Sequence, residues 1–315
     1  MDATNIMNKE ISIVVPVYNE ENNLYELYER TLQVISSLTI TYEIIFVDDG
    51  SHDHSFQVIK RIASENVNVK YIRFTRNFGH QAALFAGIEK TNGNAIVLID
   101  GDLQDPPEEI RQLWTTLQNG YDVVYAKRNS RDGESVLKKF SAALFYRILN
   151  KITHFNIPLD TGDFRIFNKR VAKELLEMKD HTKFLRGQIA WLGFKEHFIH
   201  YNRDKRKKGK SGFGFSTMIR FAIDGITGFS NFPLKFASIS GLIVSVFSFL
   251  MIIYVLLAKF LWHETIQGWT SIMLTILFLG GIQLLSIGII GEYISRINDG
   301  VRNRKLYIID QTNIQ

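Results

Sequence analysis

An apolar run breaks abruptly into acidic residues at Asp100, and this stretch has the side chains best suited to chemistry. Residues 96–99 read Ile-Val-Leu-Ile, and they are followed by Asp100, Asp102, Gln104 and Asp105. A continuous apolar run is typical of a buried parallel strand, and open α/β sheets bind ligands at the carboxyl ends of such strands. Carboxylate and amide oxygens suit Mg²⁺ or Mn²⁺, and such an ion usually keeps positions for phosphate oxygens. We therefore expect Asp100, Asp102 and Gln104 to bind a divalent metal that holds a diphosphate.

The same acids also have a simpler interpretation. An acidic turn after a strand favours the start of a helix, because carboxylates stabilise helix N-termini. A helix is expected to start near Pro106–Glu109, directly after this turn. A lone Asp-x-Asp does not distinguish a metal site from such a turn. The strands and helices around the turn are needed to distinguish the metal site from the helix start.

Short apolar strands alternate with helical stretches from Ile11 to Lys127, which predicts a mostly parallel sheet covered by helices on both faces. The expected strands are Ile11–Val17, Tyr42–Val47, Val69–Phe74, Ala95–Ile99 and Asp122–Ala126. The expected helices are Leu24–Ser36, Ser55–Ala63, Gln81–Glu89 and Ile110–Gln118. Polar residues gather where the strands end, at Tyr18–Glu20, Asp48–Ser51 and Asp100–Asp102. Because parallel strands end at one edge of a sheet, these groups predict a nucleotide crevice.

Two known classes of site are not indicated by the pattern. No Gly-x-Gly-x-x-Gly follows the first strand, which argues against a dinucleotide-binding dehydrogenase. His80 has no second His, Cys or acid at ligand spacing beside it, so we interpret it as a structural imidazole. The absence of cysteine excludes disulfides and thiolate metal sites.

Two uncharged segments near the C-terminus are long enough to cross a membrane. Residues 236–258 and 265–291 contain no charged side chain, and a hydrocarbon core needs about 20 apolar residues. We expect spans at about 236–258 and 268–292. Buried helices of a soluble core are the alternative, but soluble helices of this length usually have a polar face. Lysine and arginine flank the pair, and only Lys259 lies between, so both termini are expected on the cytoplasmic side of the plasma (inner) membrane.

Two further segments have apolar side chains at helical spacing. Residues 135–155 and 213–234 are both expected to lie in the membrane interface, although a surface helix packed on the sheet fits 135–155 equally well. The expected organisation is a cytoplasmic catalytic domain at 1–212, the interfacial segment, two transmembrane helices within 235–297 and a cytoplasmic tail at 298–315. The net charge of +5 is clustered beside the spans, which favours anionic membrane lipids over nucleic acid as the partner.

Five motifs that occur in order resemble those of a known family. They are Val15-Pro16-Val17-Tyr18-Asn19-Glu20, Val47-Asp48-Asp49-Gly50-Ser51, Arg76-Asn77-Phe78-Gly79, Asp100-Gly101-Asp102-Leu103-Gln104-Asp105-Pro106-Pro107-Glu108 and Gly162-Asp163-Phe164-Arg165. Together they resemble family 2 glycosyltransferases of the polyprenyl-phosphate type, which include the bactoprenol glucosyltransferases and dolichyl-phosphate mannose synthase. The resemblance covers almost the whole chain and extends to the two spans. It implies a Rossmann-like GT-A fold and an enzyme that transfers a sugar.

The resemblance also implies roles for individual residues. Those expected to bind the nucleotide sugar are Pro16, Tyr18, Glu20, Asp48, Asp49, Asp100 and, in a basic loop, Arg206, Lys210 and Ser211. Those expected to bind Mg²⁺ or Mn²⁺ are Asp100, Asp102 and Gln104. Those expected to bind the acceptor phosphate are Arg128 and Arg131, with Lys138 and Lys139 as further candidates. The catalytic residues are then Asp102, Arg128 and Asp163, and for Asp163 we favour positioning of the sugar over the role of a base.

The implied reaction transfers a hexose from a nucleotide diphosphate sugar to undecaprenyl or another polyprenyl phosphate at the cytoplasmic membrane face, with inversion at the anomeric carbon. UDP-glucose is the preferred donor; a UDP-aminosugar, UDP-galactose and GDP-mannose are alternatives. A processive polysaccharide synthase is disfavoured because no Gln-x-x-Arg-Trp motif is present. A non-catalytic membrane adaptor with this fold is the alternative of another class. The resemblance further implies a homo-oligomer, since relatives form a tetramer.

Overall fold

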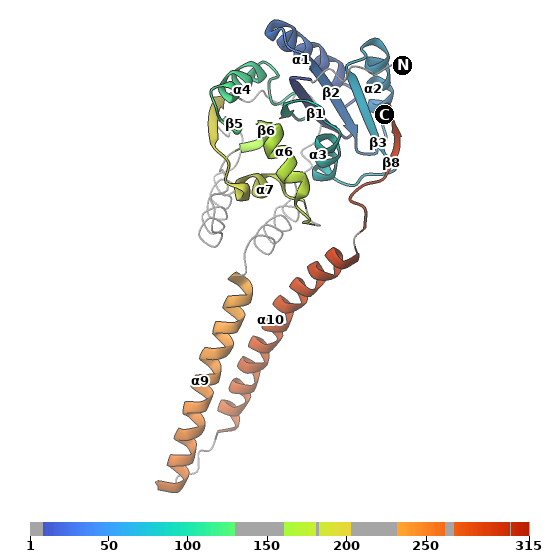
Figure 1. The fold of residues 1–315 in the computed structure, drawn as a ribbon. Helices are drawn as coiled ribbons and strands as arrows, with labels where there is room; N and C mark the ends of the chain where they lie inside the picture. Colours follow the sequence, from blue (N-terminus) through green and yellow to red (C-terminus); the bar gives the residue numbers. More distant parts are fainter. Residues whose placement is uncertain are drawn as a thin grey trace, which may run out of the picture. The chain divides into compact units, whose positions relative to one another are not determined.

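A computed structural model describes residues 9–129, 161–180, 183–202, 232–261, 268–302 and 304–314. These residues belong to two units (Figure 1). The first unit contains the described residues up to 202 and those from 305 onward, and the second contains those from 232 to 304. The first unit is built around a sheet, and the second consists of two long helices.

Four parallel strands form one half of the sheet. They are β1 (Ile11–Val17), β2 (Tyr42–Asp48), β3 (Val69–Phe74) and β4 (Ala95–Leu98). β1 pairs with β2 and with β4, and β2 pairs with β3. Every residue of β1 and β4 is buried, as expected for apolar strands that carry helices on both faces. These strands confirm the predicted ones to within one residue at each end.

The other strands run in mixed directions. They are β5 (Val123–Arg128), β6 (Thr161–Asn168), β7 (Glu196–Tyr201) and β8 (Ile309–Thr312), of which the sequence predicts only β5. The strand order is β7-β5-β6-β4-β1-β2-β3-β8. β6 runs antiparallel to both β4 and β5, and β7 runs parallel to β5. As a result β6 begins at the edge of the sheet where β4, β5 and β7 end.

Helices cover both faces of this sheet, as the sequence predicts (Figure 1). One buried cluster contains apolar side chains of α1 (Leu24–Leu38), α2 (Ser55–Glu65) and α4 (Glu109–Gln118). A second cluster contains those of α3 (His80–Glu89), α6 (Lys169–Glu177) and α7 (Leu185–Leu192). Alternate residues of β1 belong to different clusters, which places the clusters on opposite faces. The mostly parallel α/β architecture is therefore confirmed.

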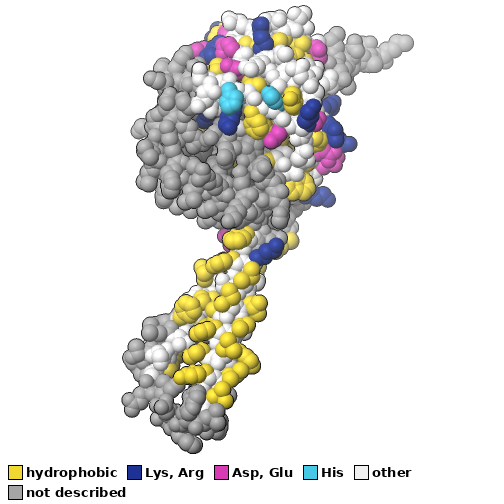
Figure 2. Space-filling model, turned by 90° about the vertical axis from the view of Figure 1, so that its left-hand side faces the viewer, with side chains coloured by type: hydrophobic (Ala, Val, Ile, Leu, Met, Phe, Trp, Pro, Cys, Tyr) yellow, Lys and Arg dark blue, Asp and Glu magenta, His cyan; other side chains and the backbone are white. Residues whose placement is uncertain are grey.

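The second unit consists of α9 (Phe232–Leu261) and α10 (Trp269–Arg302), which contact each other. They have 30 and 34 residues, and most of the apolar side chains that the structure describes on them are exposed (Figure 2). Both helices are long and apolar enough to cross a membrane. The predicted segments 236–258 and 268–292 fall on these helices. α9 is longer than its predicted segment at both ends, and α10 begins at Trp269 and continues beyond residue 292 to Arg302.

The last residues of the chain return to the sheet. Residues 298–315 are expected from the sequence to form a cytoplasmic tail, whereas α10 continues to Arg302 and Ile309–Thr312 pairs with β3 as an antiparallel edge strand. The strand sequence Ile-Asp-Gln-Thr has no alternating apolar pattern. The open edge of β3, rather than local sequence, therefore determines this strand.

Candidate active site

The turn after β4 carries the predicted metal ligands at the edge where the parallel strands end. Gly101 allows the turn to lie against β1, because a Cβ there would be 3.1 Å from the carbonyl oxygen of Pro16. Leu103 is buried and has φ of 56°, a rare backbone conformation for a bulky residue. Asp102 Oδ1 accepts a hydrogen bond of 3.1 Å from the backbone nitrogen of Gln104. The turn is thus held in a strained form, as is common at functional sites.

The start of β6 brings Asp163 into a cluster of cationic side chains, which we call the Asp163 cluster. Asp163 Oδ2 lies 3.0 Å from His80 Nε2 and accepts a hydrogen bond of 3.4 Å from Gln81 Nε2. Asp163 Oδ1 lies 3.1 Å from Arg165 Nη2 and 4.0 Å from Arg186 Nη2. Burial raises the pKa of Asp163, but the hydrogen bond from His80 and the three cationic charges outweigh it and hold the pKa well below its usual range. Asp163 is therefore an anion at physiological pH.

Arg165 is fully buried beneath this carboxylate. Its guanidinium donates hydrogen bonds to the carbonyl oxygens of Gly162 and Asp163, at 2.8 and 3.1 Å, and lies 5.1 Å from the ring centroid of Tyr125. Its Nη1 has no hydrogen-bond partner among the residues that the structure describes. A buried guanidinium needs a counter-ion, and Asp163 provides it.

His80 connects the Asp163 cluster to a predicted metal ligand. Its Nε2 lies 3.6 Å from Asp100 Oδ1, a buried atom that accepts no hydrogen bond from any described residue. Burial raises the pKa of Asp100 to about 7, with further contributions from neighbouring carboxylates. Burial alone would lower the pKa of His80, but the hydrogen bond to Asp163 and the nearby carboxylates raise it to about 9. His80 is thus a hydrogen-bonded imidazole within the candidate site, whereas the sequence predicts a structural imidazole and no role in the site.

The acidic turn fits a metal that is shared with a substrate. Asp100 offers a buried carboxylate oxygen that accepts no hydrogen bond from the part of the chain that the structure describes, and a divalent cation would satisfy it. Within the described ranges, no three His, Asp or Glu side chains are arranged to hold a metal by themselves. Mg²⁺ is usually bound through one or two carboxylates together with phosphate oxygens and water. Asp100 and Asp102 therefore suit a cation that a diphosphate helps to hold.

The loops after β1 and β2 are joined by hydrogen bonds. The backbone nitrogen of Asn19 donates to Ser51 Oγ at 3.0 Å, and that of Glu20 donates to Ser55 Oγ at 2.8 Å. The side chain of Tyr18, in the same loop, is exposed. These hydrogen bonds fix the loop that carries Tyr18 and Glu20 against the loop that follows β2.

Asp48 and Asp49 are buried and bonded to the protein. Asp48 Oδ1 accepts a hydrogen bond of 3.0 Å from the backbone nitrogen of Ser51. The two carboxylate oxygens of Asp49 accept bonds of 2.6 and 2.9 Å from the backbone nitrogens of Phe78 and Gly79. Burial raises the pKa of both aspartates. They organise the loops of the site, and their contact with a nucleotide stays a prediction.

Arg128, the predicted acceptor-phosphate ligand, ends β5 and is held by a buried network. Its Nε donates to the hydroxyl of Tyr201 at 3.2 Å, and its Nη2 lies 3.7 Å from Asp105 Oδ1. The hydroxyl of Tyr201 donates in turn to Asp105 Oδ1. The side chain of Arg128 is 24% exposed, whereas Asp105 is fully buried. The network therefore orients a guanidinium that solvent can still reach.

The structure brings together the predicted residues on β4, β5 and β6, but part of the predicted site lies outside the described residues. These residues are Arg131, Lys138, Lys139, Arg206, Lys210 and Ser211. Sequence reasoning missed Gln81, Arg186 and Tyr201, which stand in no motif. Arg165 stands in a recognised motif without an assigned role; an arginine between the apolar residues of a strand was the available signal.

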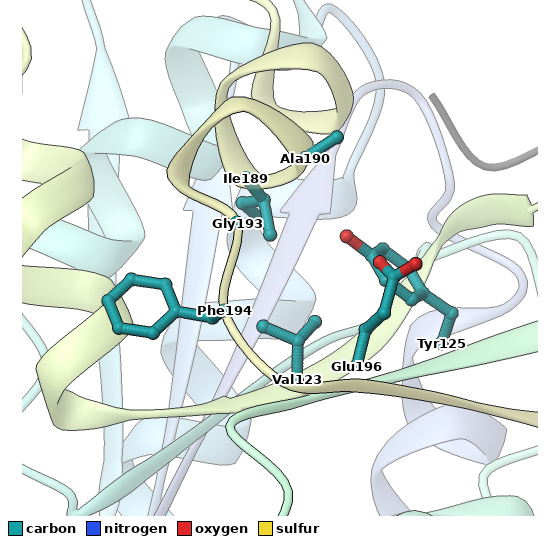
Figure 3. A pocket seen from close by; sticks show the side chains of 7 residues that line it. All are labelled: Val123, Tyr125, Ile189, Ala190, Gly193, Phe194 and Glu196. Carbon is teal, nitrogen blue, oxygen red and sulfur yellow. The ribbon is translucent and has the colours of Figure 1, made fainter. Parts of the chain in front are cut away.

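A hollow of about 250 Å³ lies between β5, β7 and α7 (Figure 3). Its lining residues are Val123, Tyr125, Ile189, Ala190, Gly193, Phe194 and Glu196. Among the described residues, none of the predicted site residues lines it, and the carboxylate of Glu196 is the one charged side chain. The described lining therefore offers no cationic group for a diphosphate.

Comparison with known proteins identifies the family. Glycosyl transferase family 2 matches residues 12–176, and the GtrB C-terminal hairpin matches residues 232–297. Over 303 residues the chain is 45% identical to the uncharacterized glycosyltransferase YkcC of Bacillus subtilis, covering 96% of this chain and 94% of the relative. Over 304 residues it is 38% identical to the SfII prophage-derived bactoprenol glucosyl transferase of Shigella flexneri, covering 96% and 98%. Among solved structures, glucosyl-3-phosphoglycerate synthase of Mycobacterium tuberculosis has a TM-score of 0.48 and 21% identity, covering 69% of this chain and 80% of that one. The chain belongs to glycosyl transferase family 2 and is a glycosyltransferase.

Proposed function

We propose that the enzyme transfers glucose from UDP-glucose to undecaprenyl phosphate, or to a related polyprenyl phosphate, at the cytoplasmic face of the membrane. The observation that carries the proposal is the acidic turn at Asp100, which faces the Asp163 cluster through His80. Its carboxylates suit the metal and diphosphate of a nucleotide sugar. The match to a bactoprenol glucosyl transferase includes the membrane hairpin, which supports a lipid-linked acceptor.

The proposed chemistry requires an oriented phosphate more than a strong base. A phosphate monoester has a second pKa near 6, so it is mostly a dianion at pH 7. One of its oxygens forms a bond to the anomeric carbon while the bond from that carbon to the diphosphate breaks. The electron pair of the broken bond leaves with the diphosphate, and the configuration inverts. Asp163, with its pKa held low, is a weak base and a good hydrogen-bond acceptor for the sugar.

Charge and orientation are then the contributions of the protein. Asp100, Asp102 and Gln104 would hold Mg²⁺ or Mn²⁺, which when bound supplies positive charge to the departing diphosphate. Arg128 would direct the acceptor phosphate, because Tyr201 and Asp105 fix its guanidinium.

Two features support a cytoplasmic catalytic unit with both chain ends on its side of the membrane. Lysine and arginine flank the hairpin, in agreement with the preference of cytoplasmic loops for positive charge. The sheet contains strands from before α9 and after α10. A sheet on one side of the membrane requires an even number of crossings between those strands, so α9 and α10 would both span it.

The test is transfer of radiolabelled sugar into lipid by the purified protein in vesicles that contain undecaprenyl phosphate and Mg²⁺ or Mn²⁺. UDP-glucose, a UDP-aminosugar, UDP-galactose and GDP-mannose are compared as donors. Asp102→Asn removes a predicted metal ligand, and Glu174→Gln, which removes the charge of an exposed carboxylate in α6, is the matched control. We expect lipid label from UDP-glucose that is lost with chelator or with Asp102→Asn and kept with Glu174→Gln. Label from another donor alone would correct the sugar, and nucleotide binding without lipid label from any donor would overturn the acceptor.

A further inference from the structure

The last residues of the chain contact β3 and α3, the two elements on either side of a loop in the predicted nucleotide-sugar site. Residues 306–313, which we call the C-terminal clamp, include β8 and the aromatic residue that precedes it. The ring of Tyr307 stacks on Phe74 at the end of β3, with 4.9 Å between centroids and 15° between planes. The hydroxyl of Tyr307 donates a hydrogen bond of 2.7 Å to Glu89 Oε2 at the end of α3. The clamp therefore contacts both elements that flank residues 75–79.

Residues 75–79 form a loop that is held from two sides. On the clamp side, Phe74 packs edge-on against Phe78 with 5.7 Å between centroids, and the backbone nitrogen of Thr75 donates to the carbonyl oxygen of Ile308 at 3.1 Å. On the other side, the backbone nitrogens of Phe78 and Gly79 donate to the Asp49 carboxylate. A continuous set of contacts thus joins the clamp to Asp49.

The loop also packs against the turn that follows β2. Gly50 has φ of 68°, and a Cβ on it would lie 2.5 Å from the carbonyl carbon of Arg76, so the two backbones are in close contact. His80 follows the loop directly and reaches Asp100 and Asp163. A displaced loop would therefore move both the Asp49 turn and the side chain beside the predicted metal ligand.

We propose that the C-terminal clamp is a positioning element for the nucleotide-sugar site, with Tyr307 as its key residue. The proposal rests on the proposed function for the identity of the ligand. Tyr307 holds Phe74 and thereby fixes the loop that bonds to Asp49 and precedes His80. Only residues 303–306 separate Tyr307 from the end of α10. The C-terminal clamp, which fixes loop 75–79, therefore follows the second long helix closely along the chain.

Hydrogen exchange of the full-length protein in lipid nanodiscs, without any ligand, tests the contact pathway itself. Tyr307→Ala removes the stacked ring, and Asn313→Ala is the matched control because Asn313 bonds to Val69 and Tyr71 at the distant end of the clamp. We expect Tyr307→Ala to accelerate exchange of the Phe78 and Gly79 amides by about tenfold, the size of one lost aromatic pair, with β1 unchanged. Asn313→Ala should leave those two amides unchanged. Unchanged exchange in Tyr307→Ala would overturn the proposal.

Ligand measurements then separate positioning from a general loss of stability. Binding of UDP and UDP-glucose with Mn²⁺ is measured by calorimetry, and KM is measured for donor and for polyprenyl phosphate. We expect Tyr307→Ala to weaken donor binding by about tenfold and to leave the acceptor KM unchanged, while Tyr307→Phe, which keeps the stacked ring, restores most of the affinity. Parallel losses for both substrates in Tyr307→Ala and Asn313→Ala, together with a lower melting temperature, would show a structural role only. Absence of nucleotide binding by the unaltered protein would overturn the proposed function, whatever the exchange measurement shows.

Discussion

Replacement of Asp163 by asparagine isolates the electrostatic role of this carboxylate. The substitution keeps the shape of the side chain and removes its charge. It leaves Arg165 fully buried and without the counter-ion that it contacts at 3.1 Å. We expect the variant to be less stable as well as less active, because the same carboxylate balances the cluster and faces the candidate site.

The size of the loss follows from the contacts. Three cationic groups have a nitrogen within 4.0 Å of the carboxylate. At an effective dielectric constant of about 20 each such contact is worth about 4–6 kcal/mol before desolvation is subtracted. Desolvation offsets much of this, and removal of one partner from a buried ion pair costs about 3–5 kcal/mol in free energy of unfolding. Arg165 dominates this figure, because His80 is partly exposed and solvent screens its charge. For a unit of about 200 residues, the melting temperature should fall by about 6–20 °C.

Thermal unfolding of the purified protein in nanodiscs measures this change, with Glu174→Gln as the control for loss of an exposed carboxylate. Adding Arg165→Met to Asp163→Asn should recover part of the stability, since both charges are then absent. A melting temperature for Asp163→Asn equal to that of the control would refute the reasoning. It would mean that the three cations do not depend on this carboxylate.

Three further predictions concern pH and acceptor binding. In chelator, the raised pKa of His80, about 9 against 6.5 when unfolded, stabilises the fold fully below pH 6.5 and progressively less up to pH 9. In urea unfolding, the free energy of unfolding should therefore fall from pH 6.5 to pH 9, and His80→Gln should make this fall smaller. An equal fall in both proteins would contradict the raised pKa of His80. Tyr201→Phe removes the hydroxyl that orients Arg128, so the acceptor KM should rise several-fold while the donor KM stays constant, and a change confined to the donor would refute this role. At low acceptor concentration the transfer rate should fall about tenfold from pH 7 to pH 5, because the dianionic fraction of a phosphate with pKa near 6 falls by that factor. The remaining activity of Asp163→Asn should fall in the same way from about pH 7 to pH 5. If the variant did not show this fall, Asp163 would be identified as the titrating base.

The part of the fold that sequence predicts is the part with local patterns. β1 and β4 are apolar runs, β2 and β3 are mostly apolar, and α1, α2 and α4 have apolar residues at helical spacing, so a sheet covered by helices is visible in the sequence. β7 has exposed residues at Glu196, His197 and His200, and β8 has mostly exposed side chains. Their pairing is determined by the open edges of β5 and β3, which no local pattern reveals.

The same division holds in the candidate site. Asp100 and Asp102 could be named because an acidic turn after a buried strand is a local signal. The environment of Asp163 could not be predicted from the sequence, because His80, Arg165 and Arg186 come from different elements and meet only in the folded protein. The low pKa of Asp163, which favours positioning over proton removal, therefore required the structure.

The antiparallel β6 has a consequence for how this enzyme can diversify. β5 ends at Arg128, β6 begins at Thr161 and β7 ends at Tyr201, and the pairing registers place all three ends at one edge of the sheet. The chain therefore leaves β5, enters β6 and leaves β7 at the edge of the sheet where Asp100 and Asp163 lie. A change in chain length between the end of β5 and the start of β6 would be joined to the sheet at this edge and would leave the strand registers intact. Evolution can thus vary the chain between these two strands while Asp100 and Asp163 remain on an unaltered sheet.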